Sequence, residues 1–192
     1  MIGRTRRRRD DERGATLVEF TIVAMLLFLL LFGIIEFGLA FRDWLTVSSA
    51  SRAAARVGSA AGTDPSADIL VLEAVEAAMT ASDVSSIREV WIYKATDNGG
   101  VAGGGTTNRY SPRPGGGCGW APCPDPDGGF SGYGGGWAPE SRNVSVGPGQ
   151  DLDLLGVRII FEHEWITGFI GDGVSTWTDD AVMRLEPQQF VP

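Results

Sequence analysis

The sequence predicts an α+β protein with a long N-terminal transmembrane and spine helix, a second helix, and a small antiparallel sheet headpiece with a Gly-rich loop. Three observations predict it: an apolar run at residues 20–35, an Ala-rich stretch without Pro at residues 42–61, and alternating apolar and polar residues near the C-terminus. We expect a basic cytoplasmic leader (1–14), a transmembrane and stalk helix (15–62), a helix and strand of the headpiece (63–96), a Gly/Pro-rich loop (97–150) and C-terminal strands of the headpiece (151–192).

The apolar run predicts a membrane-spanning helix. Between Leu17 and Phe41 only Glu19 and Glu36 are charged, and about 20 apolar residues suffice to cross a bilayer. Residues 1–13 contain six Arg and three acidic residues, so the positive-inside rule places the N-terminus in the cytoplasm and the C-terminal part outside. We therefore expect a single-pass protein of the cell (inner) membrane. A cleaved secretory signal is the alternative, although its apolar core normally has only about 7–15 residues.

The two charged residues of the run need an explanation, because an unpaired charge in the middle of a bilayer costs about 2.5–3.5 kcal/mol. Glu19 lies at the cytoplasmic edge of the run and Glu36 near its outer edge. Either both side chains extend to the membrane surface, or each meets a partner charge in an assembly.

Beyond the membrane the helix is expected to continue without a break from Ala15 to Ala61, because this stretch is Ala-rich and lacks Pro. A second helix is predicted at Ser66–Ser82, with Asp64 as N-cap and Pro65 at the first helical position. Its buried stripe would consist of Leu72, Val75 and Met79.

Strands are predicted at Glu89–Ala95, Gly156–Ile166 and Asp180–Glu186, with a loop at Gly168–Thr178. In the second of these strands Val157, Ile159, Phe161, His163 and Trp165 share one face. His163 is therefore expected to be a half-buried residue of the sheet and not a catalytic base.

The segment 97–150 has a different composition, with 17 Gly, 7 Pro and neither Leu nor Ile. Such a segment buries too little apolar surface to offset its ordering entropy, so a long loop that is extended or partly disordered is expected. Its aromatic residues alternate with Gly, which suits a sticky surface or a carbohydrate contact; a plain linker is the alternative. These residues are Tyr110, Trp120, Phe130, Tyr133 and Trp137.

The two cysteines, Cys118 and Cys123, are predicted to form a disulfide, since the expected location outside the cell permits one. Closing so small a ring contributes about 2 kcal/mol on the loop-entropy model. Two lone cysteines make a weak zinc site, and Asp125–Gly128 lacks the later ligands of an EF-hand calcium loop. No metal site is predicted.

Charge and motif content exclude several function classes. The formal net charge is −8 and the chain beyond residue 13 is acidic, which argues against nucleic acid as a partner. The sequence has no nucleophile–base constellation, phosphate loop or metal cluster. We therefore expect a protein that is not an enzyme, with no catalytic residues and no cofactors.

The segment RGATLVEF (13–20) resembles the processing site of type IV pilins, in which a basic leader ends in Gly and Glu is the fifth residue after the cut. With the apolar run around Glu36 and SRAAARVGSAAG (51–62), it resembles the TadE-like family of tight-adherence (Tad) pilus assembly proteins. The resemblance covers about residues 13–62, and the ending AVMRLEP (181–187) is also similar. It implies cleavage by a prepilin peptidase between Gly14 and Ala15, which makes Glu19 the fifth mature residue.

The resemblance implies a non-enzymatic minor pilin or pseudopilin-like component of a Tad pilus assembly system. Its partners would be membrane lipid, other pilin-like subunits and the prepilin peptidase. A new amine at Ala15 on one subunit can pair with Glu19 of a neighbour and fix the register of packed helices. The alternative function is a permanently membrane-tethered envelope protein whose Gly/aromatic loop binds a surface ligand.

Overall fold

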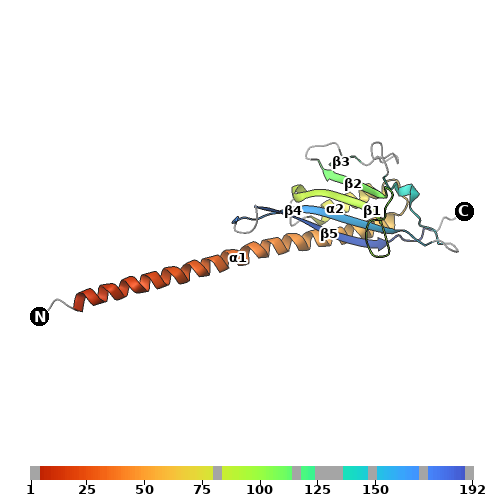
Figure 1. The fold of residues 1–192 in the computed structure, drawn as a ribbon. Helices are drawn as coiled ribbons and strands as arrows, with labels where there is room; N and C mark the ends of the chain where they lie inside the picture. The colour runs from red at the N-terminus through yellow and green to blue at the C-terminus, as the bar shows by residue number, and fades with distance from the viewer. Residues whose placement is uncertain are drawn as a thin grey trace.

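The N-terminal helix is longer than the sequence predicts. A computed structural model describes residues 5–79, 84–113, 118–123, 136–146, 151–168 and 173–188, with side chains from residue 14 onward. Helix α1 spans Thr5–Ala61, 57 residues, and so begins within the expected leader instead of at Ala15. It ends at Ala61 as predicted, where Gly62 takes a φ of +58° that favours glycine. Its N-terminal part extends away from the rest of the molecule (Figure 1).

Helix α2 spans Ala67–Ala78 and packs against α1. The prediction of Asp64 as N-cap is wrong: the N-cap is Ser66. Asp64 forms a turn before the helix, in which its side chain accepts a hydrogen bond from the Ser66 N–H at 2.7 Å. Residues 80–83, which include the predicted end of this helix, lie outside the described residues. The predicted stripe is confirmed as buried: Leu72, Val75 and Met79.

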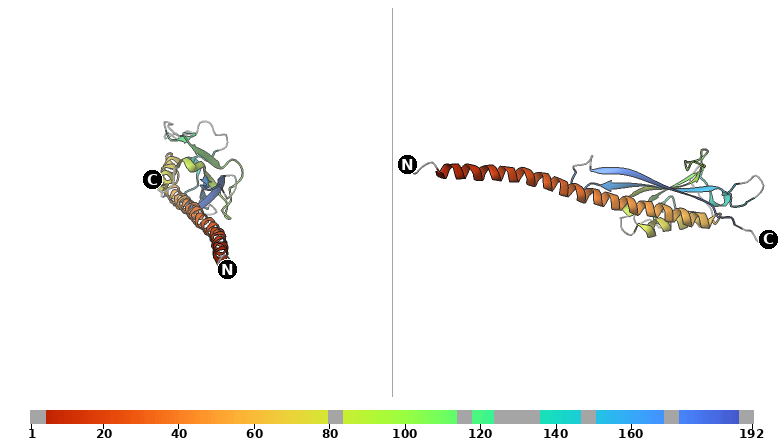
Figure 2. Two further views of the ribbon diagram at one scale, coloured as in Figure 1. Left: turned by 90° about the vertical axis from the view of Figure 1, so that its left-hand side faces the viewer. Right: turned by 90° about the horizontal axis from the view of Figure 1, so that it is seen from below.

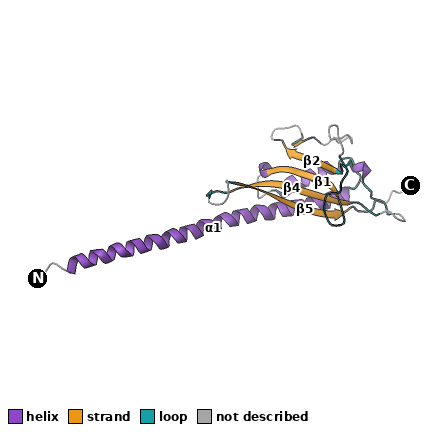
Figure 3. Ribbon diagram, in the orientation of Figure 1, coloured by secondary structure: helices purple, strands orange, loops and turns teal. Residues whose placement is uncertain are grey.

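In the part of the chain that the structure describes, five strands form one antiparallel sheet in the order β3-β2-β1-β4-β5. The fold class α+β is therefore confirmed (Figure 3). Short 3₁₀ turns lie at Val84–Ser86 and Pro139–Ser141. The strands are β1 (Ile87–Ala95), β2 (Thr107–Pro112), β3 (Trp120–Ala121), β4 (Leu154–Glu164) and β5 (Val174–Arg184).

Two segments predicted as loops are strands in part. Strands β2 and β3 lie within the expected Gly/Pro-rich loop 97–150. Strand β5 begins at Val174, inside the expected loop Gly168–Thr178. The reason is pairing with a neighbour: Val90 of β1 faces Tyr110, and β4 pairs with β5 as far as Glu164 and Val174. Such cross-strand partners decide strand formation more than intrinsic propensity does.

The core lies between the sheet and the C-terminal half of α1 with α2 (Figure 2). Small residues of α1, including Ala50 and Ala54, are fully buried there. At Gly58 an added Cβ would lie 2.8 Å from Val71 of α2 and 3.0 Å from Leu155 of β4. The small residues of the Ala-rich segment therefore have two effects. They favour the helical conformation, and they allow α2 and the sheet to pack closely against α1.

Candidate membrane and assembly site

The N-terminal half of α1 presents its apolar side chains to its surroundings. Among the residues that the structure describes, one helix is long and apolar enough to cross a membrane, and its most apolar window has no buried residue. A soluble core helix would bury such side chains against its own protein. The exposed large apolar residues of this part run from Leu17 to Phe41 and include Phe20, Leu26, Leu30 and Ile34. The helix can therefore serve as a membrane anchor.

The expected processing site lies within this continuous helix. Gly14, Ala15 and Glu19 are all exposed. An added Cβ at Gly14 would meet no atom within 4 Å. Because residues four apart lie on one helix face, Glu19 stands one turn above Ala15 on the same side. The carboxylate is therefore accessible to another chain at the level of the expected mature N-terminus.

Glu36 has a different environment from Glu19. Its side chain is only 2% exposed, because the end of the β4–β5 hairpin lies against it. The Thr167 N–H donates a hydrogen bond to Glu36 Oε1 at 3.1 Å. From the sequence, we expect this side chain either to extend to the membrane surface or to meet a partner charge in an assembly. The carboxylate is buried, not exposed, and has a hydrogen-bond partner within its own chain; a partner charge in an assembly stays a prediction.

A second polar contact joins the hairpin to α1 above Glu36. His163 Nδ1 lies 2.9 Å from Asp43 Oδ2, and the imidazole is buried. The ring stacks on Trp177 at 5.4 Å and meets Trp165 edge-to-face at 4.8 Å. His163 is thus a sheet residue, as expected, but more deeply buried. Its contact with Asp43 was missed, because the two residues are 120 positions apart.

A buried polar network in the headpiece was also missed. Asp68 of α2 forms an ion pair with Arg142, and both side chains are fully buried. The Asp68 carboxylate also accepts hydrogen bonds from Asn108 Nδ2 and the Tyr110 hydroxyl, each at 2.8 Å. The guanidinium lies over the ring of Trp137 at 4.7 Å. An Asp at the start of a helix gives too weak a signal to predict such a network.

On the opposite face of the sheet, Arg158 of β4 donates two hydrogen bonds to Asp180 of β5, at 2.6 and 2.9 Å. These bonds raise the pKa of the Arg158 guanidinium. Burial, followed by the negative charge of Asp180, raises the pKa of Tyr93 on β1 above its ordinary value of 10.0. This cluster ties three neighbouring strands together.

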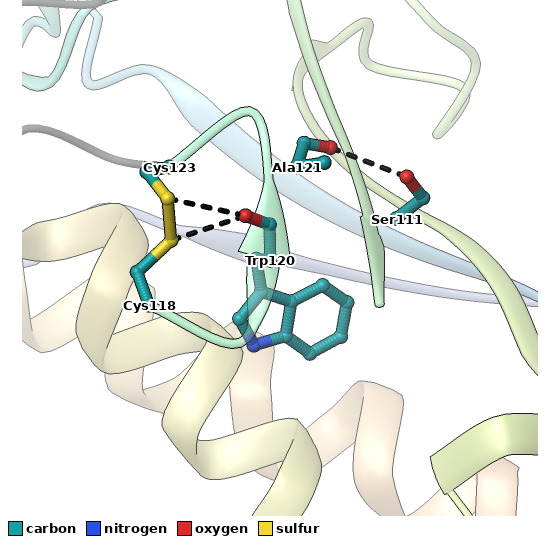
Figure 4. The surroundings of a disulfide bond; sticks show 5 residues. All are labelled: Ser111, Cys118, Trp120, Ala121 and Cys123. Atoms are coloured by element: carbon teal, nitrogen blue, oxygen red, sulfur yellow. Dashed lines mark hydrogen bonds between the residues drawn. A yellow bond between two sulfur atoms is a disulfide. The ribbon is translucent and has the colours of Figure 1, made fainter. Parts of the chain in front are cut away.

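The two cysteines form the predicted disulfide, which closes a short loop around β3 (Figure 4). Both sulfur atoms lie near the Trp120 carbonyl oxygen, Cys118 at 3.0 Å and Cys123 at 3.4 Å. The Trp120 ring is buried in the core. The disulfide therefore holds a core residue that comes from the Gly-rich segment.

Within the described ranges, no group of three or more His, Cys, Asp or Glu side chains is placed to hold a metal ion. The calcium-like segment Asp125–Gly128 lies outside the described residues. A groove near the candidate membrane anchor is apolar and open, about 560 Å³ in volume, and lies between α1 and β5. This region can pack against apolar partners but does not assemble acid–base or nucleophilic groups.

Comparison with known proteins found a family match for the N-terminal helix. No curated protein and no solved structure was found to match the chain. A family model described as TadE-like protein matches residues 14–56, which lie within α1 and contain the apolar side chains, Glu19 and Glu36. Through its N-terminal helix, this chain is similar to the TadE-like proteins.

Proposed function

We propose that this protein is a non-enzymatic, pilin-like component of a Tad pilus assembly system, anchored by α1 with its N-terminus in the cytoplasm. The observation that carries the proposal is the exposed apolar surface of α1 with Glu19 at its cytoplasmic end. The TadE-like match over the same residues supports it. A helix of this kind packs equally well against lipid and against the helices of sister subunits.

The proposed mechanism begins with the prepilin peptidase, which cuts between Gly14 and Ala15. The cut removes the Arg-rich leader, which otherwise holds the helix at the cytoplasmic surface. It also creates an α-amine at Ala15. When subunits pack, this amine pairs with Glu19 of a neighbour, so that two charges leave the lipid together. One such pair per subunit fixes the axial register of the bundle, as a buried polar residue does in a coiled coil.

The contrast between the two carboxylates supports assigning this role to Glu19. Glu19 is exposed, whereas Glu36 is buried and already accepts a hydrogen bond from Thr167. In this proposal Glu36 contributes to assembly indirectly, because it holds the headpiece against α1.

The ligand-binding alternative, a permanently tethered envelope protein, receives less support from the Gly-rich segment. Tyr110, Trp120 and Trp137 are buried in the headpiece, so these three rings are not available to a surface ligand. Phe130 and Tyr133 lie outside the described residues.

The test compares Glu19→Gln with Glu36→Gln in cells that assemble the pilus. We expect Glu19→Gln to reduce the amount of the protein in sheared pili by at least about tenfold, the factor that corresponds to about 1.4 kcal/mol, with normal membrane insertion. Glu36→Gln keeps a hydrogen-bond acceptor and should reduce the amount of the protein in sheared pili much less. Mass spectrometry should give Ala15 as the mature N-terminus. An intact leader in cells with normal pili, or full incorporation of Glu19→Gln, would contradict the proposal.

A further inference from the structure

The end of the β4–β5 hairpin reaches far along α1 toward the membrane anchor. Thr167 contacts Glu36 through its N–H, and the ring of Trp165 meets Phe37 edge-to-face at 6.0 Å. Figure 1 shows this end of the hairpin projecting beyond the other strands along α1. The hairpin is also fixed above this point by the contact of His163 with Asp43.

The level of Glu36 in a bilayer follows from the length of the helix. The exposed apolar surface begins at Leu17, and the rise of 1.5 Å per residue places Glu36 about 28 Å further along the axis. The hydrocarbon core of a bilayer is about 30 Å thick. If the core begins at Leu17, its outer boundary therefore lies at Glu36. Phe37 and Phe41 then lie just beyond this boundary, in the headgroup layer.

The hairpin end has the composition of a membrane-contacting surface. Ile166 is 73% exposed, and residues 165–168 (Trp-Ile-Thr-Gly) carry no charge. Beside it, Phe37, Phe41 and Trp44 are exposed on α1 and line the apolar groove that runs to Trp177. A large apolar side chain at the level of the hydrocarbon boundary meets lipid and not bulk water.

We propose that the end of the β4–β5 hairpin, residues 165–167, inserts into the outer interfacial layer of the bilayer beside α1, as a second membrane contact. This inference rests on the proposed membrane-spanning position of α1. The insertion holds the headpiece in one orientation on the membrane. It also covers Glu36 with protein at the point where its carboxylate would otherwise face the acyl chains, which explains how a charged residue fits at the end of the span.

The experiment uses the full chain in vesicles of phosphatidylcholine and phosphatidylglycerol. Ile166→Cys is labelled with a fluorophore, and quenching is measured with lipids brominated near the headgroup end of their acyl chains. Because Cys118 and Cys123 are joined in a disulfide, the label reacts with the introduced thiol. We expect brominated lipids to reduce the emission at Ile166→Cys to less than half.

The chain offers a matched control. Val146 is another β-branched residue, 72% exposed, in a segment whose Val144 carbonyl accepts a hydrogen bond from Gln188 near the other end of the headpiece. The label at Val146→Cys should not be quenched. A third variant, Leu27→Cys, reports the span itself. Because Leu27 is exposed in the middle of the apolar run, its label is measured with lipids brominated near the methyl end of their acyl chains.

The three labels separate the possible failures. Quenching at Leu27→Cys without quenching at Ile166→Cys would overturn the hairpin inference and leave the membrane anchor intact. A Leu27→Cys label that is not quenched would overturn the anchor, and the hairpin inference with it. A label at Ile166→Cys whose emission shifts to the blue but resists quenching would show that protein, and not lipid, surrounds this residue, which also contradicts the proposal.

Discussion

Replacing Arg142 by Met should destabilise the headpiece strongly. The Arg142 and Asp68 side chains are both fully buried, so the substitution leaves the Asp68 carboxylate in the core without its counter-charge. Breaking a buried ion pair by removing one partner costs about 3–5 kcal/mol. Asn108 and Tyr110 still donate hydrogen bonds to the carboxylate. We therefore expect a loss near the lower limit, about 3 kcal/mol in the free energy of unfolding.

The same substitution at Arg88 provides the control. Arg88 pairs with Glu162 at 2.7 Å, but its side chain is 61% exposed. A solvent-exposed pair contributes about 0–1 kcal/mol, so Arg88→Met should lower the free energy of unfolding by less than about 1 kcal/mol. The two variants remove the same side chain and differ in the burial of the partner charge.

The assay is urea unfolding of the full chain in detergent micelles, followed by near-ultraviolet circular dichroism, which reports the aromatic residues of the headpiece. If Arg142→Met and Arg88→Met lower the free energy of unfolding equally, the reasoning from burial is refuted. The double variant Asp68→Leu/Arg142→Met supplies a second check. It removes both charges and should be more stable than Arg142→Met, because no unpaired charge remains in the core.

Three further predictions concern the sheet and the disulfide. In Gly156→Ala the new Cβ would lie 2.2 Å from the Tyr93 ring, so we expect a loss of about 1–3 kcal/mol in urea unfolding. Burial raises the pKa of Tyr93 above 10.0 in the folded chain, so the phenol loses its proton at a lower pH in the unfolded chain. The contribution of the un-ionised phenol to the free energy of unfolding is present below pH 10 and should be lost as pH rises further. Replacing Cys118 and Cys123 by Ser should cost about 2 kcal/mol, measured by the same urea titration.

Each of these predictions has its own control. Gly103→Ala, where an added Cβ meets no atom within 4 Å, should change the unfolding free energy little, and an equal loss at both glycines would contradict the packing argument. Tyr93→Phe removes the phenol and should flatten the decline in stability above pH 10; an unchanged slope would assign the decline to other groups. For the disulfide, the double serine variant should match the reduced wild-type chain, and a large difference between them would contradict the loop-entropy account.

Much of the fold follows from local patterns in the sequence. The apolar run and the Ala-rich stretch predict α1 as far as Ala61, and the spacing of Leu72 and Val75 predicts the buried face of α2. The alternation around Ile159 predicts the buried face of β4. These signals are readable because helix and strand periodicities depend on residues close together in the chain.

The strands inside the Gly-rich segment could not be predicted in this way. Residues 107–112 form β2 because β1 supplies a row of hydrogen-bonding partners, although the composition around them favours a loop. Likewise, β5 begins several residues before its apolar alternation becomes clear, because β4 is long enough to pair with it from Val174 onward. The composition of a segment indicates how much conformational entropy is lost when the segment becomes ordered. It does not indicate the hydrogen bonds and packing with a neighbouring strand that offset this loss.

Hydrophobicity along a single stretch of sequence was enough to predict an apolar helix that can serve as a membrane anchor. The processing site at Gly14 and Ala15 and the role of Glu19 follow from the resemblance of residues 13–20 to type IV pilins and stay predictions. The burial of Glu36 and its hydrogen bond, by contrast, become visible only in the folded structure. Its partner, Thr167, is 131 residues away, and the hydrogen bond forms because the β4–β5 hairpin folds back along α1. Long-range contacts of this kind leave no periodic signal in the sequence, since they depend on where complete elements pack in space.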